Sequence, residues 1–283
     1  MNFAMRHYAR LVTAVLLTSC LISPSATACT ILSAVAPDGQ VWTGNNEDGP
    51  LDVPLYLNVF PRTDDTRFGY FTFTYDSPRA GIQGGMNEAG LTYDFNALQQ
   101  PYPLKDPARR NPYPGGDDAI LGHLLASAST TGEVVRFFEN YWFTEGFERA
   151  QMHVADKHGT LAIISPSGSQ VFTREETLVT TNFNAITGNN GSRCWRHPVA
   201  TRLLAESEAG LATITEVCRR TAQNGDGWGT LYSNVQNLTT SEIWIYPGQK
   251  FDQPLKTTLS TLITAGRQSY RIQDLATTLP RSE

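Results

Sequence analysis

The chain has 283 residues, 40% of them hydrophobic, which is enough for one sizeable domain or two small ones. Its formal net charge is −5 at pH 7, so it lacks the basic footprint of proteins that bind nucleic acid or anionic membrane surfaces. These values exclude both of those classes and are ordinary for a globular protein.

The first 28 residues have the features of a signal peptide. Arg6 and Arg10 form a positive start, an apolar stretch runs from Leu11 to Ile22, and Ala26-Thr27-Ala28 is a small-residue cleavage site. The apolar stretch is too short for a stable membrane span, although an uncut anchor is an alternative. We therefore expect an exported protein, periplasmic or secreted, whose mature chain begins at Cys29.

A second cleavage site competes with the first. Leu17-Thr18-Ser19-Cys20 resembles the lipobox of bacterial lipoproteins, in which the cysteine is lipidated and becomes the first residue. The two cleavages exclude each other as the final N-terminus. The site after Ala28 is favoured because it lies at the end of the apolar region, where signal-peptide cleavage falls.

The first half of the mature chain reads as strands followed by helices. Strands are predicted at 30–35 and 41–43, joined by the turn Pro37-Asp38-Gly39, and further strands are predicted at 55–60, 68–75 and 90–95. Helices are predicted at 118–128 and from Thr130, where Thr130 and Glu133 match a capping box.

The second half repeats this succession. Strands are predicted at 151–155, 160–164, 171–173 and 178–181, helices at 195–206 and 211–222, strands at 231–235 and 242–246, and a last helix at 255–265. No linker and no internal repeat interrupts residues 29–283, so we predict one domain. Blocks of strands followed by blocks of helices favour an α+β domain with packed layers.

A cysteine that directly follows a signal-peptide cleavage site has a specific chemical meaning. Once residues 1–28 are removed, Cys29 carries both its thiol and a free α-amino group. An α-amine has a pKa of about 7.7–8.0, so a useful fraction is unprotonated at neutral pH. It can take the thiol proton, directly or through one water, and later supply a proton to a leaving amine. Cys29 is therefore a candidate nucleophile that needs no histidine.

The other cysteines leave alternatives open. Cys194 and Cys218 would form a disulfide in an oxidising compartment, or would be two small buried residues. The alternative for Cys29 is an ordinary cysteine that happens to follow the cleavage site and pairs with one of these two. The cysteine pattern alone does not decide between these readings.

Four short motifs follow one another in the mature chain. They are Cys29-Thr30 with Gly44-Asn45-Asn46-Glu47-Asp48, then Gly85-Met86-Asn87-Glu88-Ala89-Gly90-Leu91, then Leu178-Val179-Thr180-Thr181-Asn182-Phe183, and finally Cys194-Trp195-Arg196 leading into Leu203-Leu204. Together they resemble the N-terminal nucleophile hydrolases of the choloylglycine hydrolase group. This group includes bile-salt hydrolases, penicillin V acylases and acyltransferase-like linear amide hydrolases.

The resemblance implies a fold and an activity. The fold would be a four-layer αββα sandwich, with two antiparallel sheets face to face and helices outside. The activity would be hydrolysis of a linear, non-peptide C–N bond in a small N-acyl amide through an acyl-thioester, with acyl transfer from the same intermediate as an option. It implies no metal and no organic cofactor, and His153, His158 and His197 lack metal-ligand spacing.

The resemblance also implies roles for residues. Cys29 would attack the carbonyl, and Asp48 would orient its amine or thiol. Asn182 would donate a side-chain N–H to the oxyanion, and Arg196 would support the cysteine and lower its thiol pKa. Three further residues come with looser matches: Arg193 and Arg202 are rivals of Arg196, and Asn96 would offer a backbone N–H to the oxyanion.

The substrate pocket is less defined. Bile-salt and penicillin V enzymes carry arginine where this chain has Asn45, so the acyltransferase-like branch is the closer match. Trp42 and Phe95 are candidate pocket residues because they lie near the site motifs. The aromatic cluster from Phe137 to Phe143 is expected to belong to the core.

Two other functions remain as alternatives. A dipeptidase of the related cysteine-nucleophile group also starts with Cys-Thr, although those chains are usually much longer. A non-catalytic exported binding protein on the same fold is the third hypothesis, and it predicts that Cys29→Ala changes neither ligand binding nor phenotype. Nucleic acid is not an expected partner, and the sequence makes no prediction of the oligomeric state.

Overall fold

Two antiparallel sheets make up most of the protein. The computed structural model describes residues 29–78, 81–188 and 194–280. The six-stranded sheet has the order β12-β1-β2-β13-β14-β15, with β1 Thr30–Val35, β2 Val41–Pro50, β12 Leu178–Thr180, β13 Trp228–Asn237, β14 Glu242–Pro247 and β15 Leu255–Thr258. The eight-stranded sheet has the order β11-β10-β9-β6-β5-β4-β3-β16, with β3 Leu55–Phe60, β4 Tyr70–Tyr75, β5 Ile82–Asn87, β6 Leu91–Ala97, β9 Ala150–Asp156, β10 Leu161–Ser165, β11 Gly168–Phe172 and β16 Gln268–Arg271.

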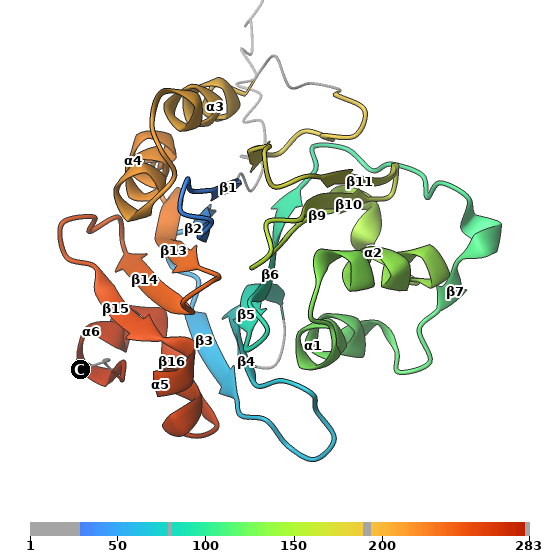
Figure 1. Cartoon of the computed structure of the whole chain (residues 1–283), viewed down its shortest axis with the longest axis horizontal. Coiled ribbons are helices and arrows are strands. Elements are labelled where there is room, and N and C mark those ends of the chain that lie inside the picture. The colour runs from blue at the N-terminus through green and yellow to red at the C-terminus, as the bar shows by residue number, and fades with distance from the viewer. Residues whose placement is uncertain (1–28, 79–80, 189–193, 281–283) are drawn as a thin grey trace, which may run out of the picture.

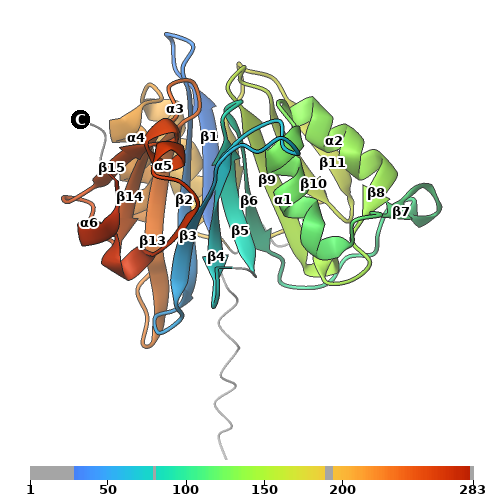
Figure 2. The same cartoon turned by 90° about the horizontal axis from the view of Figure 1, so that it is seen from below.

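Helices cover the outer faces of the two sheets. On the six-stranded sheet lie α3 (Arg196–Glu206) and α4 (Leu211–Thr221), and on the eight-stranded sheet lie α1 (Asp117–Ser127) and α2 (Thr131–Asn140). Figures 1 and 2 show the resulting order of helices, sheet, sheet and helices. The predicted four-layer αββα sandwich is therefore confirmed. The remaining elements are short: β7 Asn111–Pro112, β8 Tyr141–Trp142, α5 Leu259–Thr264, α6 Leu275–Thr278, and the 3-10 turns Pro107–Arg109, Phe147–Arg149 and Ile272–Asp274.

The core between the sheets is built from alternate residues of facing strands. Phe73 of β4 and Tyr232 of β13 are both buried, with ring centroids 4.8 Å apart. Successive side chains of a strand point to opposite faces, so each strand gives one row to this inner layer and the other row to a helix layer. Leu259 and Leu275, from the short C-terminal helices, complete the same cluster.

A buried histidine joins the sheets near the first hairpin. His153 of β9 bonds Ser33 of β1 through Nε2 at 2.8 Å and Thr180 of β12 through Nδ1 at 3.0 Å. Burial lowers the pKa of His153 to about 3, so its ring is neutral at physiological pH. This contact fixes β1 against the neighbouring sheet close to Cys29.

Most predicted elements are confirmed within one to three residues, and a few are wrong. The strand predicted at 41–43 extends through residues 44–48, which form most of the second half of β2. The predicted helix 255–265 is strand β15 followed by α5, because 255–258 pairs with β14 and the Thr258 side chain caps the helix at the Thr261 N–H. Strands β5 and β16 were not predicted from the sequence.

The glycine pair Gly84-Gly85 lies inside β5 at a site of close packing. A Cβ atom on Gly85 would lie 2.2 Å from the Phe71 carbonyl oxygen, which is backbone of the paired strand β4. We expect Gly85→Ala to destabilise the protein by about 3 kcal/mol in urea unfolding. Gly122→Ala is the matched control: its Cβ meets only Tyr70 Oη at 3.5 Å inside α1, so it should be neutral or stabilise by about 0.5–1 kcal/mol. Equal effects for both variants would contradict this packing argument.

Two further observations concern export and redox chemistry. Across the described ranges, no helix is long and apolar enough to cross a membrane. Cys194 and Cys218 carry free thiols, and Cys218 is buried under β2, so the disulfide alternative does not occur here. The predicted signal peptide 1–28, Cys20 and Arg193 all lie outside the described residues.

Candidate active site

The first hairpin positions Cys29 opposite Glu47. Thr30 pairs with Asn46 in the antiparallel ladder between β1 and β2, so the preceding residue, Cys29, faces Glu47. Directly opposed residues point to the same face of a sheet. The Cys29 Sγ donates a hydrogen bond to Glu47 Oε1 at 3.4 Å, and both side chains are buried.

The inner face of β2 therefore carries a carboxylate beside the thiol. Glu47 also accepts a hydrogen bond from the Tyr75 hydroxyl at 2.6 Å and one from Asn45 Nδ2 at 3.3 Å. Burial raises the pKa of Glu47 from 4.5 to about 7, although all three hydrogen bonds lower it. Asn45 thus supports a carboxylate here.

Asp48 points to the opposite face of the same strand. Its carboxylate accepts hydrogen bonds from Gln223 Nε2 at 2.5 Å and from the Thr230 hydroxyl, and it lies 3.8 Å from an Arg196 guanidinium nitrogen. Burial raises the pKa of Asp48 from 3.8 to about 7, against the lowering effect of Thr230, Arg196 and Gln223. The side chain of Asp48 is fully buried, so these partners hold it away from solvent.

Arg196, in the first turn of α3, connects the groups of the site through its guanidinium. One guanidinium nitrogen donates to the Cys29 carbonyl oxygen at 2.7 Å and to Thr30 Oγ1 at 2.9 Å, and the other donates to Asn182 Oδ1 at 2.9 Å. This side chain is 5% exposed, whereas Arg202 on the same helix is exposed. Arg196 therefore lies at the site, and its rival Arg202 does not.

Two asparagines complete the surroundings of the Cys29 carbonyl. Asn96 Nδ2 donates to the Cys29 carbonyl oxygen at 3.2 Å, and Asn182 Nδ2 donates to the Ala97 carbonyl oxygen at 2.8 Å. Both asparagines are buried. The four residues expected to act together, Cys29, Asp48, Asn182 and Arg196, are thus joined through one network.

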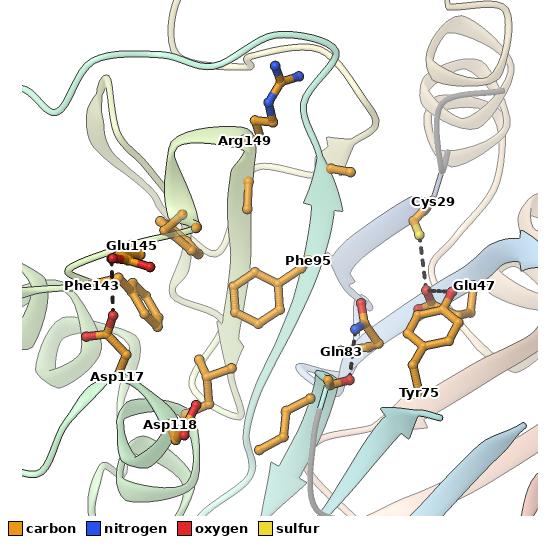
Figure 3. A pocket seen from close by; sticks show the side chains of 17 residues that line it. Cys29, Glu47, Tyr75, Gln83, Phe95, Asp117, Asp118, Phe143, Glu145 and Arg149 are labelled. Atoms are coloured by element: carbon orange, nitrogen blue, oxygen red, sulfur yellow. Dashed lines mark hydrogen bonds between the residues drawn. The ribbon is translucent and has the colours of Figure 1, made fainter. Parts of the chain in front are cut away.

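A cavity of about 560 Å³ opens beside the thiol. Cys29, Glu47 and Tyr75 lie on one side of it, while Phe95 and Phe143 face them, as Figure 3 shows. Other lining residues come from β5 and its start, from the first half of α1 and from the 143–150 segment, among them Gln83, Asp118, Leu121, Glu145, Phe147 and Arg149. Its volume lies within the range of small-molecule sites, and most of its surface is apolar.

Solved structures show the same architecture. Two variants of conjugated bile acid hydrolase from Clostridium perfringens match with TM-scores of 0.61 and 0.59 at 13% and 14% identity, each over 86% of this chain and 96% of theirs. Penicillin V acylase from Agrobacterium tumefaciens matches with a TM-score of 0.58 at 14% identity, over 86% of this chain and 90% of the acylase. This chain has the N-terminal nucleophile hydrolase fold. No protein-family model and no curated protein sequence matches it.

Within the N-terminal nucleophile hydrolase fold, the electrostatics of the thiol differ from expectation. We expected the charge of Arg196 to lower the pKa of the thiol. Instead, burial raises the pKa of Cys29 well above 9, with further increases from the charges of Glu47 and Asp48 and a lowering by the Asp48 backbone N–H. The contacts of Arg196 explain the difference, because its nitrogens bond the Cys29 carbonyl oxygen rather than supply charge at the sulfur.

The predicted pocket residues divide into two groups. Phe95 lines the cavity, together with Phe143 from the aromatic cluster that was expected to be core. Trp42 does not line it: its ring packs 5.6 Å from Trp244 in the outer layer under α3 and α4. The correction follows from strand alternation, because Trp42 and Glu47 stand at positions of opposite parity on β2.

Sequence reasoning missed Glu47 and Tyr75. Extending the hairpin ladder from Thr30 to residue 29 would have placed Glu47 on the thiol side. Tyr75 lies on β4 of the other sheet, so only the packing of the two sheets brings its hydroxyl to Glu47. Within the described part of the chain, no group of three or more His, Cys, Asp and Glu side chains has a metal-binding arrangement.

Proposed function

We propose that this chain is an exported amide hydrolase in which Cys29 is the nucleophile. It attacks the carbonyl of a linear, non-peptide C–N amide, releases the amine and leaves an acyl-thioester that water then cleaves. The observation that carries this proposal is the position of Cys29. Its thiol borders an apolar cavity, and its carbonyl oxygen accepts hydrogen bonds from Arg196 and Asn96. A conjugated bile acid hydrolase and a penicillin V acylase share the fold, which supports amide hydrolysis.

The buried polar groups fit this chemistry. Asn182 would donate its amide to the oxyanion, which requires its hydrogen bond to Ala97 to be exchanged for one to the substrate. Arg196 and Asn96 position the Cys29 main chain, and Asp48 anchors Arg196 from the other side of the strand. The apolar wall formed by Phe95 and Phe147 favours an acyl group with hydrophobic surface.

Export controls activity in this proposal. Removal of residues 1–28 frees the α-amino group of Cys29, whose proton exchange is needed for release of the leaving amine. We therefore expect the exported protein to begin at Cys29 and to hydrolyse acyl amides, and the uncleaved form to be inactive. Intact mass and N-terminal sequencing of both forms, followed by assays on a panel of N-acyl amides and dipeptides, test this expectation.

The outcomes are clear-cut. A chain that begins at a lipidated Cys20, or an uncleaved form that turns over substrate, would overturn the maturation scheme. Hydrolysis of dipeptides alone would replace the acyl amide by a peptide substrate while keeping the nucleophile.

A further inference from the structure

Glu47 is the carboxyl group in direct contact with the nucleophilic sulfur. Its Oε1 atom accepts the hydrogen bond of the Cys29 thiol at 3.4 Å, and its side chain is 1% exposed at the wall of the cavity. Figure 3 shows the two side chains pointing toward each other across the ladder of β1 and β2. Cys29 directly precedes the paired residue Thr30, so the contact lies at the end of the ladder between β1 and β2.

The partners of Glu47 define its protonation state in this arrangement. The Tyr75 hydroxyl donates to Oε1, Asn45 Nδ2 donates to Oε2, and the thiol donates to Oε1. Three donors on one carboxyl group match an ionised carboxylate, which accepts at both oxygens and donates none. Glu47 is therefore set up as a proton acceptor for the thiol.

The charges around Glu47 explain why it works near neutral pH. Burial raises its pKa to about 7, and Asp94, buried on the facing strand β6, has a pKa raised well above 3.8 by burial and by the charge of Glu47. The titratable groups that interact with the charge of Glu47 are Cys29 before β1, Tyr75 in β4, Asp94 in β6 and Tyr232 in β13, together with Asp48 on the other face of β2.

We propose that Glu47 is a second catalytic proton-transfer residue, which takes the thiol proton while the α-amino group serves the leaving amine. As the S–C bond forms, the S–H proton moves to Glu47 Oε1 and the carbonyl π electrons move to oxygen. As the C–N bond breaks, the α-ammonium protonates the leaving nitrogen. In deacylation, the α-amine takes a proton from the attacking water, the S–C bond breaks, and Glu47 returns its proton to sulfur.

This division of roles rests on the proposed function and refines it. An α-ammonium with a pKa of about 7.7–8.0 is mostly protonated at pH 7, so it is better suited to give a proton than to take one. A carboxylate that titrates near 7 is well suited to take one. We therefore expect kcat/KM to rise as Glu47 ionises around pH 7 and to fall again as the ammonium loses its proton.

The test is Glu47→Gln, which keeps the size and most hydrogen bonds of the side chain. We expect kcat/KM to drop by about 100-fold and the rising limb near pH 7 to disappear. Tyr75→Phe removes a hydrogen bond that lowers the pKa of Glu47, so its rising limb should move to higher pH. Glu216→Gln, at a half-buried position of α4 that does not line the cavity, is the control and should leave the profile unchanged.

A second measurement does not need the substrate. Iodoacetamide alkylation of Cys29, followed by mass spectrometry across pH, reports the pKa of the thiol. Because the charge of Glu47 raises that pKa, Glu47→Gln should lower it, so alkylation at pH 7 becomes faster while turnover becomes slower. Because loss of the fold would also expose the buried Cys29 and speed its alkylation, the comparison requires Glu47→Gln to unfold in urea at the same midpoint as the wild type.

The results separate the two proposals. If Cys29→Ala is inactive but Glu47→Gln retains kcat/KM within threefold with the same rising limb, Glu47 has no proton-transfer role and the nucleophile stands. An unchanged thiol pKa in Glu47→Gln would also overturn this proposal, because the charge of Glu47 would then have no effect on the thiol. If Cys29→Ala retains activity, the proposed function fails first.

Discussion

Cys29→Ala is expected to lower turnover of an N-acyl amide by about 10⁴-fold or more, because no acyl-thioester can form. The substitution removes only a sulfur atom from a buried position, so the ladder between β1 and β2 should persist. Mass spectrometry of the protein quenched during turnover should show an acyl adduct on Cys29 in the wild type and none in the variant. This measurement reports the covalent step itself.

Cys194→Ala is the matched control for this experiment. Cys194 is a half-buried free thiol just before α3, outside the network around Cys29, so the variant should retain turnover and the acyl adduct. Substantial hydrolysis by Cys29→Ala would reject the nucleophile. Intact ligand binding with no turnover in the wild type would favour a binding protein on this fold.

The sequence predicted the layers better than it predicted the strand partners. For residues 30–35 and for the helices at 117–127 and 211–221, the local sequence pattern and the surrounding structure favour the same secondary structure. Strand β5 was missed because Gly84-Gly85 has no side chains to show alternation, and it is a strand because β4 and β6 flank it. The leucines at 255, 259 and 262 have helical spacing, yet pairing with β14 makes the first of them part of a strand.

The candidate site shows the same division. Cys29, Asp48, Asn182 and Arg196 come from motifs, and the structure joins them in one network. The surroundings of the sulfur depend on the pairing register and on the opposite sheet, which motifs do not encode. For that reason Glu47 was overlooked and the pKa of the thiol was expected to shift in the wrong direction.

Arg196 is the residue whose loss should cost most in stability. Its guanidinium bonds the Cys29 carbonyl, Thr30 and Asn182 and lies 3.8 Å from the carboxylate of Asp48, which is completely buried. Arg196→Ala removes one donor from each of these acceptors, although the Cys29 carbonyl keeps its hydrogen bond from Asn96, and it leaves Asp48 without its cation. Removing one partner of a buried ion pair costs about 3–5 kcal/mol, and urea unfolding at pH 8 should show a loss of that size.

The pH dependence identifies Asp48 as the source of this loss. Its folded pKa, about 7, lies above its ordinary 3.8, so its contribution to stability is fully present below pH 3.8 and is lost as pH rises through 7. Arg196 lowers that pKa, so in Arg196→Ala the loss should continue above pH 7, and the gap to wild type should be smaller at pH 5 than at pH 8.

Two variants of α3 complete this test. Arg202→Ala changes an exposed residue of the same helix and should stay within about 0.5 kcal/mol of wild type. Arg196→Lys keeps a cation near Asp48 but lacks the planar fork that reaches both the Cys29 carbonyl and Asn182, so it should recover stability more than turnover. If Arg196→Ala were as stable as Arg202→Ala at pH 8, the network around Asp48 would not hold β1, β2 and α3 together.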